Sequence, residues 1–399
     1  MLVFASDLHL TDTPEGSSFS AHAFTRSLEE LPRFAPDDGI KDVQLVLLGD
    51  IFELLKSTKW LDRNVRPWEA ATITHRQTVR EVFDGIVHAN APLFRELERL
   101  RTGYGLSISY VPGNHDAPLN GPMGVGCRKQ LRELLGSSVT DDRVFDESFR
   151  DDDCGVLARH GHHWDPANAY TFGTVAAGDF VVIDILARLP RVLAEHLRTT
   201  ADDPELAFAY ELDDVIPQTP RMMAVWLGQN TERLTRLRGR AAMKAALGDI
   251  ADELEKRAAN CQFAEDLASW WVNVLKTLVF VAAGKVDLVK WTAKLASHAA
   301  ASPPAFSDDA RGDLDETGKA YSCFVFGHTH MPDHRVLAGP TPRRLLNCGA
   351  WRRVHHAAET AGLAPAFATS YTGALAVIRT AAEASSRQKR YELRRFFYG

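Results

Sequence analysis

The sequence has few cysteines, and they follow no recognisable pattern. Only five of its 399 residues are cysteine. Their number is odd, they are scattered, and none has the Cys-x-x-Cys spacing, which excludes a disulfide framework and a thiolate zinc site. Such sparse cysteine usage is typical of a reducing compartment, so we expect a cytoplasmic protein. The five are Cys127, Cys154, Cys261, Cys323 and Cys348.

Long apolar runs and an excess of basic residues are also missing. No stretch reaches the roughly 18 consecutive apolar residues of a membrane span. The first apolar run follows no charged segment and already ends at Asp7, which is unlike a secretory signal. The net charge of -6 gives no support to a nucleic-acid partner, because proteins that coat nucleic acids are usually basic. The 45% hydrophobic fraction is that of an ordinary globular protein, large enough for one domain with an insertion or for two domains.

Short apolar runs alternate with helical segments over the first part of the chain. The pattern predicts strands at 2–5, 43–48, 106–112 and 155–161, helices around 21–31 and 127–136, and one or two helices over 69–101. Strands that alternate with helices predict an α/β fold. A helix-rich region follows, after which the strand pattern returns in "SCFVFGHTH" at 322–330 and in shorter strands near 343–347, 375–379 and 391–397. We therefore expect one domain formed by 1–165 and 320–399, with 166–319 as a helical insertion.

Polar side chains stand where several of these strands should end. In an open α/β sheet the carboxyl ends of the strands form the ligand crevice. Residues two apart on an extended segment point the same way, so each Asp-x-His or His-x-His pair can aim two ligands at one place. The candidates are Asp7 and His9 in "SDLHL", Asp50 in "GDIFE", Asn114 and His115 in "GNHD", His160 in "HGHHWD", and His328 and His330 in "GHTH".

The composition of this set indicates a metal site. Oxygen and imidazole ligands without thiolates suit Mn²⁺, Fe or Zn²⁺ better than Ca²⁺. The set is too large for one tetrahedral ion, and it suits two divalent ions that share a carboxylate. Two such ions beside Asp7 and Asp50 leave the site formally positive, which attracts a phosphate group and stabilises charge during an in-line displacement. We expect two ions, with Mn²⁺ first and Fe or Zn²⁺ as the alternatives.

The five motifs, in this order, resemble those of the calcineurin-like metallophosphoesterase superfamily. The resemblance covers roughly 1–165 and 320–350. It implies a four-layer α-β-β-α sandwich in which a hydroxide between two metal ions attacks phosphorus. It also implies the site roles. Asp7, His9, Asp50 and His330 would hold one ion, and Asp50, Asn114, His160 and His328 the other, with Asp50 as the bridge. His115 would stabilise the transition state or protonate the leaving oxygen, and Asp116 would orient His115.

Within that superfamily, the motifs are most similar to those of UDP-2,3-diacylglucosamine hydrolases. Those enzymes cleave a pyrophosphate bond in lipid A synthesis and carry a helical insertion over the active site. Here His115 and His162 stand where those enzymes usually have arginine and aspartate, and the insertion is much longer. The resemblance implies a hydrolase of a phosphodiester or pyrophosphate bond in a small-molecule or lipid-linked substrate. A phosphomonoesterase or a nuclease would use the same chemistry, and a non-catalytic scaffold is the alternative of a different class.

For several residues near the motifs, and for one stretch of the insertion, the sequence allows two roles. His162, His163 and Asp165 would contact substrate or hydrogen-bond to the ligands. Asn347 would support the site or contact substrate, and Glu53 would support the site or begin a helix. In the insertion, tryptophans, aliphatic residues and lysines within 270–295 form a helical stripe. The stripe would be core packing, or a face that serves as a lid over an acyl chain or contacts the inner face of the membrane. The oligomeric state is left open.

Overall fold

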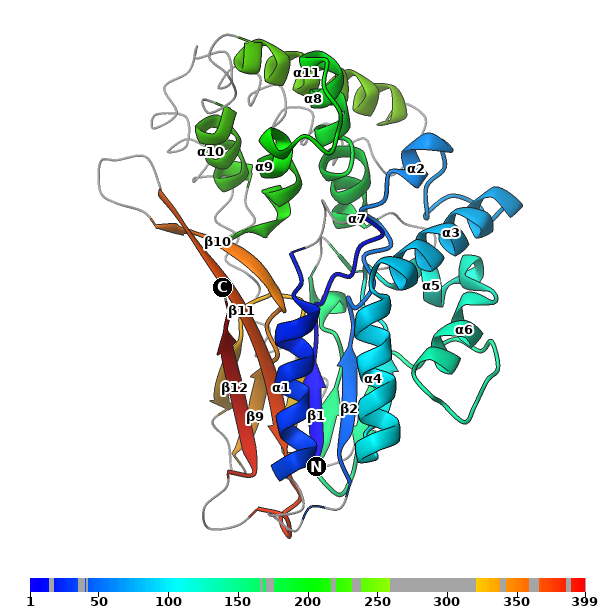
Figure 1. The fold of residues 1–399 in the computed structure, drawn as a ribbon, viewed down its shortest axis with the longest axis vertical. Helices are drawn as coiled ribbons and strands as arrows, with labels where there is room; N and C mark the ends of the chain where they lie inside the picture. Colours follow the sequence, from blue (N-terminus) through cyan, green and yellow to red (C-terminus); the bar gives the residue numbers. More distant parts are fainter. Residues whose placement is uncertain are drawn as a thin grey trace.

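The computed structural model describes residues 1–13, 18–34, 40, 42–165, 168–169, 176–216, 220–231, 238–258, 321–337, 342–358, 366–384 and 389–398. Within them the chain is a mixed α/β protein with two mixed β-sheets, one of seven strands and one of five (Figure 1). The stripe expected within 270–295 lies outside the described residues.

The first sheet contains the strand at the start of the chain at its centre. Its order is β3 (Ser107–Val111), β2 (Gln44–Leu48), β1 (Leu2–Ala5), β11 (Ala366–Ile378), β10 (Arg352–Ala358) and β6 (Val215–Ile216), and β12 (Tyr391–Phe397) also pairs with β11. β1, β2 and β3 run parallel, and β11 runs antiparallel to β1. The carboxyl ends of the three parallel strands therefore meet at one edge of the sheet.

The second sheet brings the two sides of the insertion together. Its order is β4 (Phe149–Asp151), β5 (Val156–Ala158), β7 (Cys323–Phe326), β9 (Arg343–Asn347) and β8 (Asp333–Leu337). β5, β7 and β9 are parallel. β5 precedes the insertion and β7 follows it, and the two are neighbours in the sheet.

Alternation along β1 determines how the layers pack. Leu2 and Phe4 belong to the buried cluster between the two sheets, which they share with Val156 and Val325. Val3 and its equivalents in β2 belong instead to the larger cluster on the helical side. This follows from the two-residue period of a strand, which sends successive side chains to opposite faces.

Helices cover the other face of the first sheet. α1 (Ala21–Phe34) and α4 (Ala91–Tyr104) lie along this face, while α3 (Ile73–Ala89) contacts α4 and lies beyond the ends of β1 and β2 (Figure 1). The Thr72 side chain accepts a hydrogen bond from the backbone of His75 at the start of α3, and Gly105 in the left-handed conformation ends α4. Short helices α2 (Lys59–Asp62), α5 (Ala117–Asn120) and α6 (Cys127–Leu134) follow the strand ends. The helix layer expected outside the second sheet stays a prediction.

The described part of the insertion is helical and lies at the end toward which β1 and β2 point (Figure 1). It comprises α7 (Ala177–Val181), a π-helical turn η4 (Val182–Leu186), α8 (Leu189–Leu197), α9 (Ala207–Tyr210), the 3-10 turn η6 (Glu211–Asp214), α10 (Pro220–Thr231) and α11 (Arg238–Ala258). One strand of the insertion, β6, pairs with β10 and so joins the first sheet. None of the described helices combines the length and the apolar character needed to cross a bilayer.

Candidate metal centre

The expected ligands lie on loops with an unusual backbone conformation. Among the described residues, seven that are not glycine have positive φ, and five of these are Asp7, His9, Asp50, His328 and His330. Residues with a Cβ rarely adopt this backbone conformation. Each one costs about 1–3 kcal/mol of stability and persists only where the surrounding structure holds it in place. Strain of this kind gathers at functional sites, so the backbone marks these five positions without reference to any motif.

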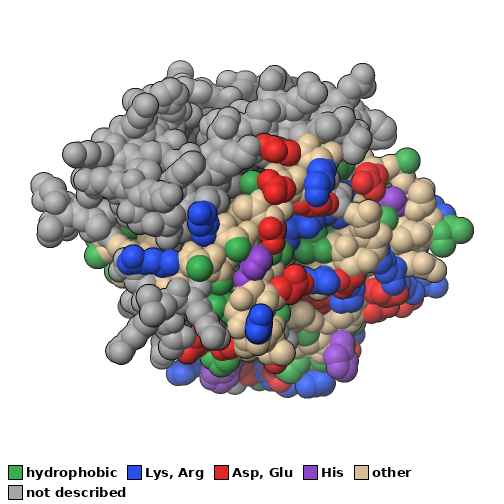
Figure 2. Space-filling view, turned by 90° about the horizontal axis from the view of Figure 1, so that it is seen from above, with side chains coloured by type: hydrophobic (Ala, Val, Ile, Leu, Met, Phe, Trp, Pro, Cys, Tyr) green, Lys and Arg blue, Asp and Glu red, His purple; other side chains and the backbone are tan. Residues whose placement is uncertain are grey.

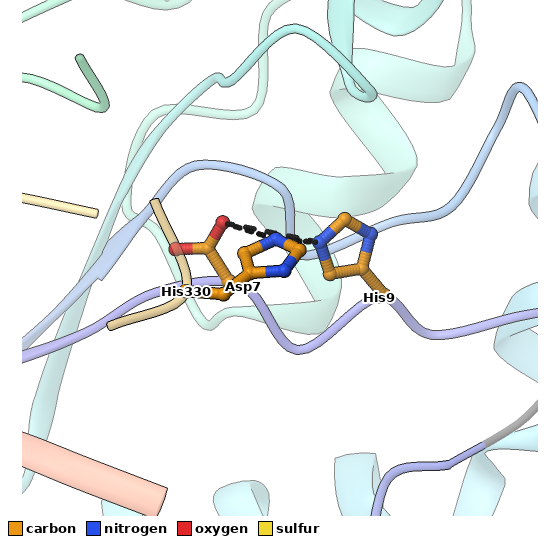
Figure 3. A group of neighbouring side chains, drawn as sticks. All are labelled: Asp7, His9 and His330. Carbon is orange, nitrogen blue, oxygen red and sulfur yellow. Dashed lines mark hydrogen bonds and ion pairs between the residues drawn. The ribbon is translucent and has the colours of Figure 1, made fainter. Parts of the chain in front are cut away.

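The first group of ligands consists of Asp7, His9 and His330 (Figure 3). Oδ1 of Asp7 lies 3.3 Å from Nε2 of His330 and 3.8 Å from Nε2 of His9. The two imidazoles approach each other to 3.1 Å between their Nε2 atoms. One carboxylate oxygen and two ring nitrogens thus converge on a single place, which is the donor set a divalent ion needs.

The second group consists of Asp50, His160 and His328. Nε2 of His160 lies 3.0 Å from Oδ2 of Asp50 and 4.0 Å from Oδ1 of Asp7, so the two groups adjoin. The rings of His160 and His328 are 5.3 Å apart, because they follow the neighbouring parallel strands β5 and β7. Within the described residues the groups could hold metal, whereas the number of ions and the bridging role of Asp50 stay predictions.

Glu53 connects the first group to the expected catalytic histidine. Its Oε2 lies 2.8 Å from Nδ1 of His9, and its Oε1 lies 2.8 Å from Nδ1 of His115. The three residues form a further cluster that could bind metal. The 2% exposure of Glu53 means that these two bonds orient both rings in a site sheltered from water. The sequence predicts that Glu53 supports the site or begins a helix, and its contacts with the rings of His9 and His115 favour the supporting role.

Glycines let the ligand loops approach one another. A methyl group on Gly327 would collide with Ser6 and with the Asp7 carboxylate, and one on Gly113 would collide with Asp50. The backbone amide of His328 donates to Oδ2 of Asp7 at 3.0 Å. The loops after β1, β2, β3 and β7 are therefore packed backbone against side chain, with no space for a larger residue.

The electrostatics of the carboxylates favour a bound cation. Burial disfavours the ionised form of Asp7, but nearby imidazoles, His160 above all, outweigh it and hold the pKa of Asp7 well below its usual range. The same balance of burial against His160 lowers the pKa of Asp50. Both groups are therefore charged at neutral pH inside a buried site.

The histidines divide into neutral and protonated rings. Burial lowers the pKa of His330 to about 4 against the attraction of Asp7, so this ring is neutral at pH 7 and keeps a lone pair for an ion. Burial also disfavours protonation of His160 and His115, but the carboxylates beside them prevail. Asp50 and Asp7 raise the pKa of His160 to about 9, and Glu53 and Asp50 raise that of His115 to about 10. The extra proton of His160 is on Nε2, the nitrogen that faces Asp50, and a bound cation would take its place there.

Two buried atoms test whether an ion fits. Oδ1 of Asp7 and Nε2 of His160 are buried, and within the described residues neither makes a hydrogen bond of good geometry. A buried polar atom left this way costs about 1–3 kcal/mol. A divalent cation in the first group would satisfy the Asp7 oxygen, and one in the second group would satisfy the His160 nitrogen, so the residues present fit the expected metals.

The remaining predicted residues lie around this core. Asp116 does not contact the ring of His115 in the described structure; its carboxylate accepts from the backbone amides of Ile51, Phe52 and Gly113 at 2.8–3.3 Å. It therefore joins the second and third ligand loops, and the contact with the His115 ring comes from Glu53.

Asn347 and the "HGHHWD" residues occupy different positions. Asn347 is buried, donates to Gly327 O and Thr329 Oγ1, and accepts from the Gly349 amide, so it supports the loop that carries His328 and His330. His162 packs 5.6 Å from the ring of His160, while His163 is exposed and lies against Trp164. Asp165 reaches His328, at 3.0 Å between Oδ2 and Nε2. Substrate contact by any of these stays a prediction.

No motif in the sequence predicts the ion pairs that join the insertion to the loops around the site. Lys56, three residues after Glu53, pairs with Asp213 at 2.8 Å. Arg352, the first residue of β10, pairs with Asp213 and Asp214. Figure 2 views the molecule from the insertion end and shows acidic, basic and histidine side chains side by side on this face. Each of these contacts spans more than a hundred residues, which no local pattern reveals.

We compared the chain with protein-family models and with curated proteins. No protein-family model matches the chain, and no curated protein matches it.

Proposed function

We propose that this chain is a two-metal phosphoesterase of the calcineurin-like metallophosphoesterase superfamily, which hydrolyses a phosphodiester or pyrophosphate bond. The observation that carries the proposal is the convergence of Asp7, His9 and His330 beside Asp50, His160 and His328, from loops that follow four different strands. The positive φ of five of these six residues supports it independently.

The proposed ligand sets are those of the motifs. Asp7, His9, Asp50 and His330 would hold one ion, and Asp50, Asn114, His160 and His328 the other. When bound, two divalent ions would supply positive charge for a phosphate group and lower the pKa of the attacking water. The low pKa values of Asp7 and Asp50 keep both side chains ready as anionic ligands. Mn²⁺ is the proposed ion, with Fe and Zn²⁺ as alternatives.

His115 is the proposed proton donor. Glu53 holds Nδ1 of the ring, and the carboxylates around it raise the pKa of His115 to about 10, so the imidazolium persists at neutral pH. Nε2 is then the nitrogen that can donate a proton to the leaving oxygen or stabilise its charge. A positioned acid is typically worth roughly 10²–10⁴-fold in rate, which sets the loss expected for His115→Ala.

The insertion is proposed as a cover that selects the substrate. Its described helices lie at the end of the molecule that carries the ligands (Figure 1), and its Asp213 pairs with Lys56 beside Glu53. A cover over a charged centre suits a substrate that joins a phosphate to a larger, lipid-linked or nucleotide-linked group. The four-layer form of the catalytic domain, a cytoplasmic location and contact with the inner face of the membrane belong to the same proposal.

The test of the activity is a substrate comparison with the Mn²⁺-loaded full chain. We expect turnover of bis(4-nitrophenyl) phosphate and of a UDP-sugar, and none after chelation. Asp50→Asn should abolish turnover, whereas Asp153→Asn, an exposed carboxylate, should not change it. His115→Ala should retain the ions and lose most of kcat; if it also empties the site, His115 is a ligand.

Other outcomes would assign the centre differently. Preference for 4-nitrophenyl phosphate would indicate a phosphomonoesterase, and preference for DNA a nuclease. A protein that binds Mn²⁺ but turns over none of these substrates would contradict the proposal.

The test of the cover uses a deletion that keeps the ion pairs to the catalytic domain. Residues 220–320 are replaced by a flexible linker, while 176–216, with Asp213 and Asp214, remain. A selecting cover predicts near-normal hydrolysis of the small aryl diester with loss of activity on the lipid-linked or nucleotide-linked substrate. Equal retention of both activities would show that this part of the insertion has no role in selection.

A further inference from the structure

The segment after His160 contacts two of the proposed ligands of the second ion. Oδ2 of Asp165 lies 3.0 Å from Nε2 of His328. Nδ2 of Asn168 donates to the same Asp165 oxygen at 2.7 Å. Nδ2 of Asn114 in turn donates to Oδ1 of Asn168 at 3.5 Å. A short chain of hydrogen bonds thus runs from His328 through Asp165 and Asn168 to Asn114, at the point where the insertion begins.

The position of the proton on His328 follows from this geometry. An ionised carboxylate can only accept hydrogen bonds, so the Nε2 that faces Asp165 carries the proton. The lone pair of the imidazole is then on Nδ1, the nitrogen that can bind a cation. Asp165 therefore fixes both the tautomer and the rotation of the ring.

Two other proposed ligand histidines are held in the same manner. Nδ1 of His9 contacts Glu53 at 2.8 Å, while its Nε2 faces Asp7. Nδ1 of His160 donates to the Leu48 carbonyl at 3.0 Å, while its Nε2 faces Asp50. In each ring one nitrogen is bonded to an oxygen outside the cluster and the other is directed inward. His328 follows this arrangement with the two nitrogens exchanged, and oxygen partners of this kind commonly orient metal-binding histidines.

We infer that Asp165, supported by Asn168, is a positioning residue for the second ion, and that it holds His328 so that Nδ1 faces the metal. The inference rests on the proposed function, because it presupposes that His328 binds an ion. It adds that the segment across the start of the insertion, from Asp165 to Asn168, supports the metal centre. Asp165 contacts none of Asp7, His9 and His330 in the described structure, so its loss should weaken one ion and leave the other in place.

The test is Zn²⁺ titration of the metal-free full chain by calorimetry, with the histidine tautomers read by ¹⁵N NMR. Zn²⁺ is diamagnetic, and His328→Gln assigns the signals. In the wild type we expect two binding steps and a His328 ring protonated on Nε2. Asp165→Ala should weaken one step by roughly 10–100-fold, the usual effect of removing such a partner. Asp165→Asn, whose carbonyl still accepts from Nε2, should restore most of the affinity and the tautomer.

Controls separate this inference from the proposed function. Asp153→Ala removes an exposed carboxylate just before β5, the strand that leads to His160, and should leave both binding steps unchanged. Two wild-type steps in Asp165→Ala, or a His328 proton on Nδ1 in the Zn²⁺-loaded protein, would overturn the positioning role and leave the two-metal proposal standing. A wild-type chain that binds no Zn²⁺ or Mn²⁺ would overturn both.

Discussion

Individual residues at this site combine backbone strain with close packing. Five proposed ligands have positive φ, and the glycines between them fill positions where a methyl group would overlap a ligand. A larger side chain at one of these glycines would force its loop to shift, and the shift would displace the carboxylate or the imidazole of a neighbouring loop. The geometry of the site should therefore depend on glycines as strictly as on the ligands themselves.

Gly327→Ala tests this dependence. The added Cβ would meet Ser6 and Oδ2 of Asp7, so we expect about 1–3 kcal/mol of lost stability and weaker Zn²⁺ binding. Gly248→Ala is the matched control, because it lies inside α11 with nothing near the added atom, and it should gain about 0.5–1 kcal/mol. Urea unfolding and calorimetry measure both. Unchanged Zn²⁺ affinity in Gly327→Ala would show that the loops yield without disturbing Asp7.

His115 provides a pH test on the metal-free protein. Its folded pKa is raised to about 10 from about 6.5, so the folded state holds the proton more tightly than the unfolded state. The stability that this adds is full below pH 6.5 and is lost as pH rises toward about 10. His115→Gln should therefore lose less stability than the wild type across that window, as measured by urea unfolding.

An exposed histidine supplies the comparison for this experiment. His356 lies on β10 with its side chain exposed, so His356→Gln should keep the wild-type pH dependence. If His115→Gln and His356→Gln decline in parallel with the wild type, the ring of His115 does not carry the proton assigned to it.

How much of the site could be predicted depends on whether the signal is local. Asp7, His9, Asp50, Asn114, His160, His328 and His330 stand in short motifs at strand ends, and the structure gathers six of them into two adjoining groups. The contact of Glu53 with two rings was only partly predictable, since an acid three residues after Asp50 suggests proximity but no partner. The Asp165 contact with His328 joins residues more than 160 positions apart, which spacing cannot indicate.

At the scale of elements, several strands could be predicted from their apolar residues, even where charged residues interrupt them, as in "RRLLN" and "YELRRFF". The expected strands at 2–5, 343–347 and 391–397 match β1, β9 and β12 in their bounds. β10 reads "RRVHHAA" and β8 reads "DHRVL", so neither has the apolar alternation that marks a strand, and both were missed. β6 has only two residues and forms because β10 offers it an edge. Tertiary pairing, rather than local propensity, creates these three strands.

The segment 211–216 joins the described helices of the insertion to the first sheet. Asp214 pairs with Arg352 and Arg353, and β6 runs alongside β10. Arg352 is buried, and removal of a partner from a buried ion pair typically costs about 3–5 kcal/mol because it leaves an uncompensated charge. A deletion that removed this segment would lose stability for this reason alone, whatever the insertion contributes to catalysis.

Asp214→Ala measures this junction. Arg352 keeps Asp213 as a partner in this variant, so we expect the loss of one charged contact, about 1–3 kcal/mol in the free energy of unfolding. Asp213→Ala/Asp214→Ala leaves Arg352 without either acidic partner and should cost more, about 3–5 kcal/mol. Asp202→Ala removes an exposed carboxylate from the same insertion and should change stability by less than about 0.5 kcal/mol. If Asp214→Ala and Asp202→Ala change the free energy of unfolding equally, the ion pair of Asp214 with Arg352 does not stabilise the fold.

At the scale of the whole molecule, the site lies where the two sheets meet. Asp7 and Asp50 follow strands of the first sheet, and His160 and His328 follow strands of the second. An ion held by both would stabilise the packing of one sheet on the other. At a free concentration of 100 times its dissociation constant, each bound ion adds about 2.7 kcal/mol to the folded state.

Chelation should therefore lower the Tm of the Mn²⁺-loaded protein, and added Mn²⁺ should restore it. Scanning calorimetry gives the size of the shift. Asp50→Asn, which lacks a carboxylate expected to contact both ions, should show a Tm that the chelator moves much less. A wild-type Tm that is the same with and without chelator would contradict the presence of stabilising ions.

The central place of β1 in the first sheet has a consequence for synthesis on the ribosome. Residues 2–4 pair with residues 376–378 on one side and with residues 44–46 on the other. A nascent chain that has emerged only as far as the insertion has one side of β1 bare, and a bare strand edge invites pairing with other chains. His328 and His330 are also still to be translated at that stage. The candidate metal centre therefore cannot form in step with translation, and its completion waits for the C-terminal part of the chain.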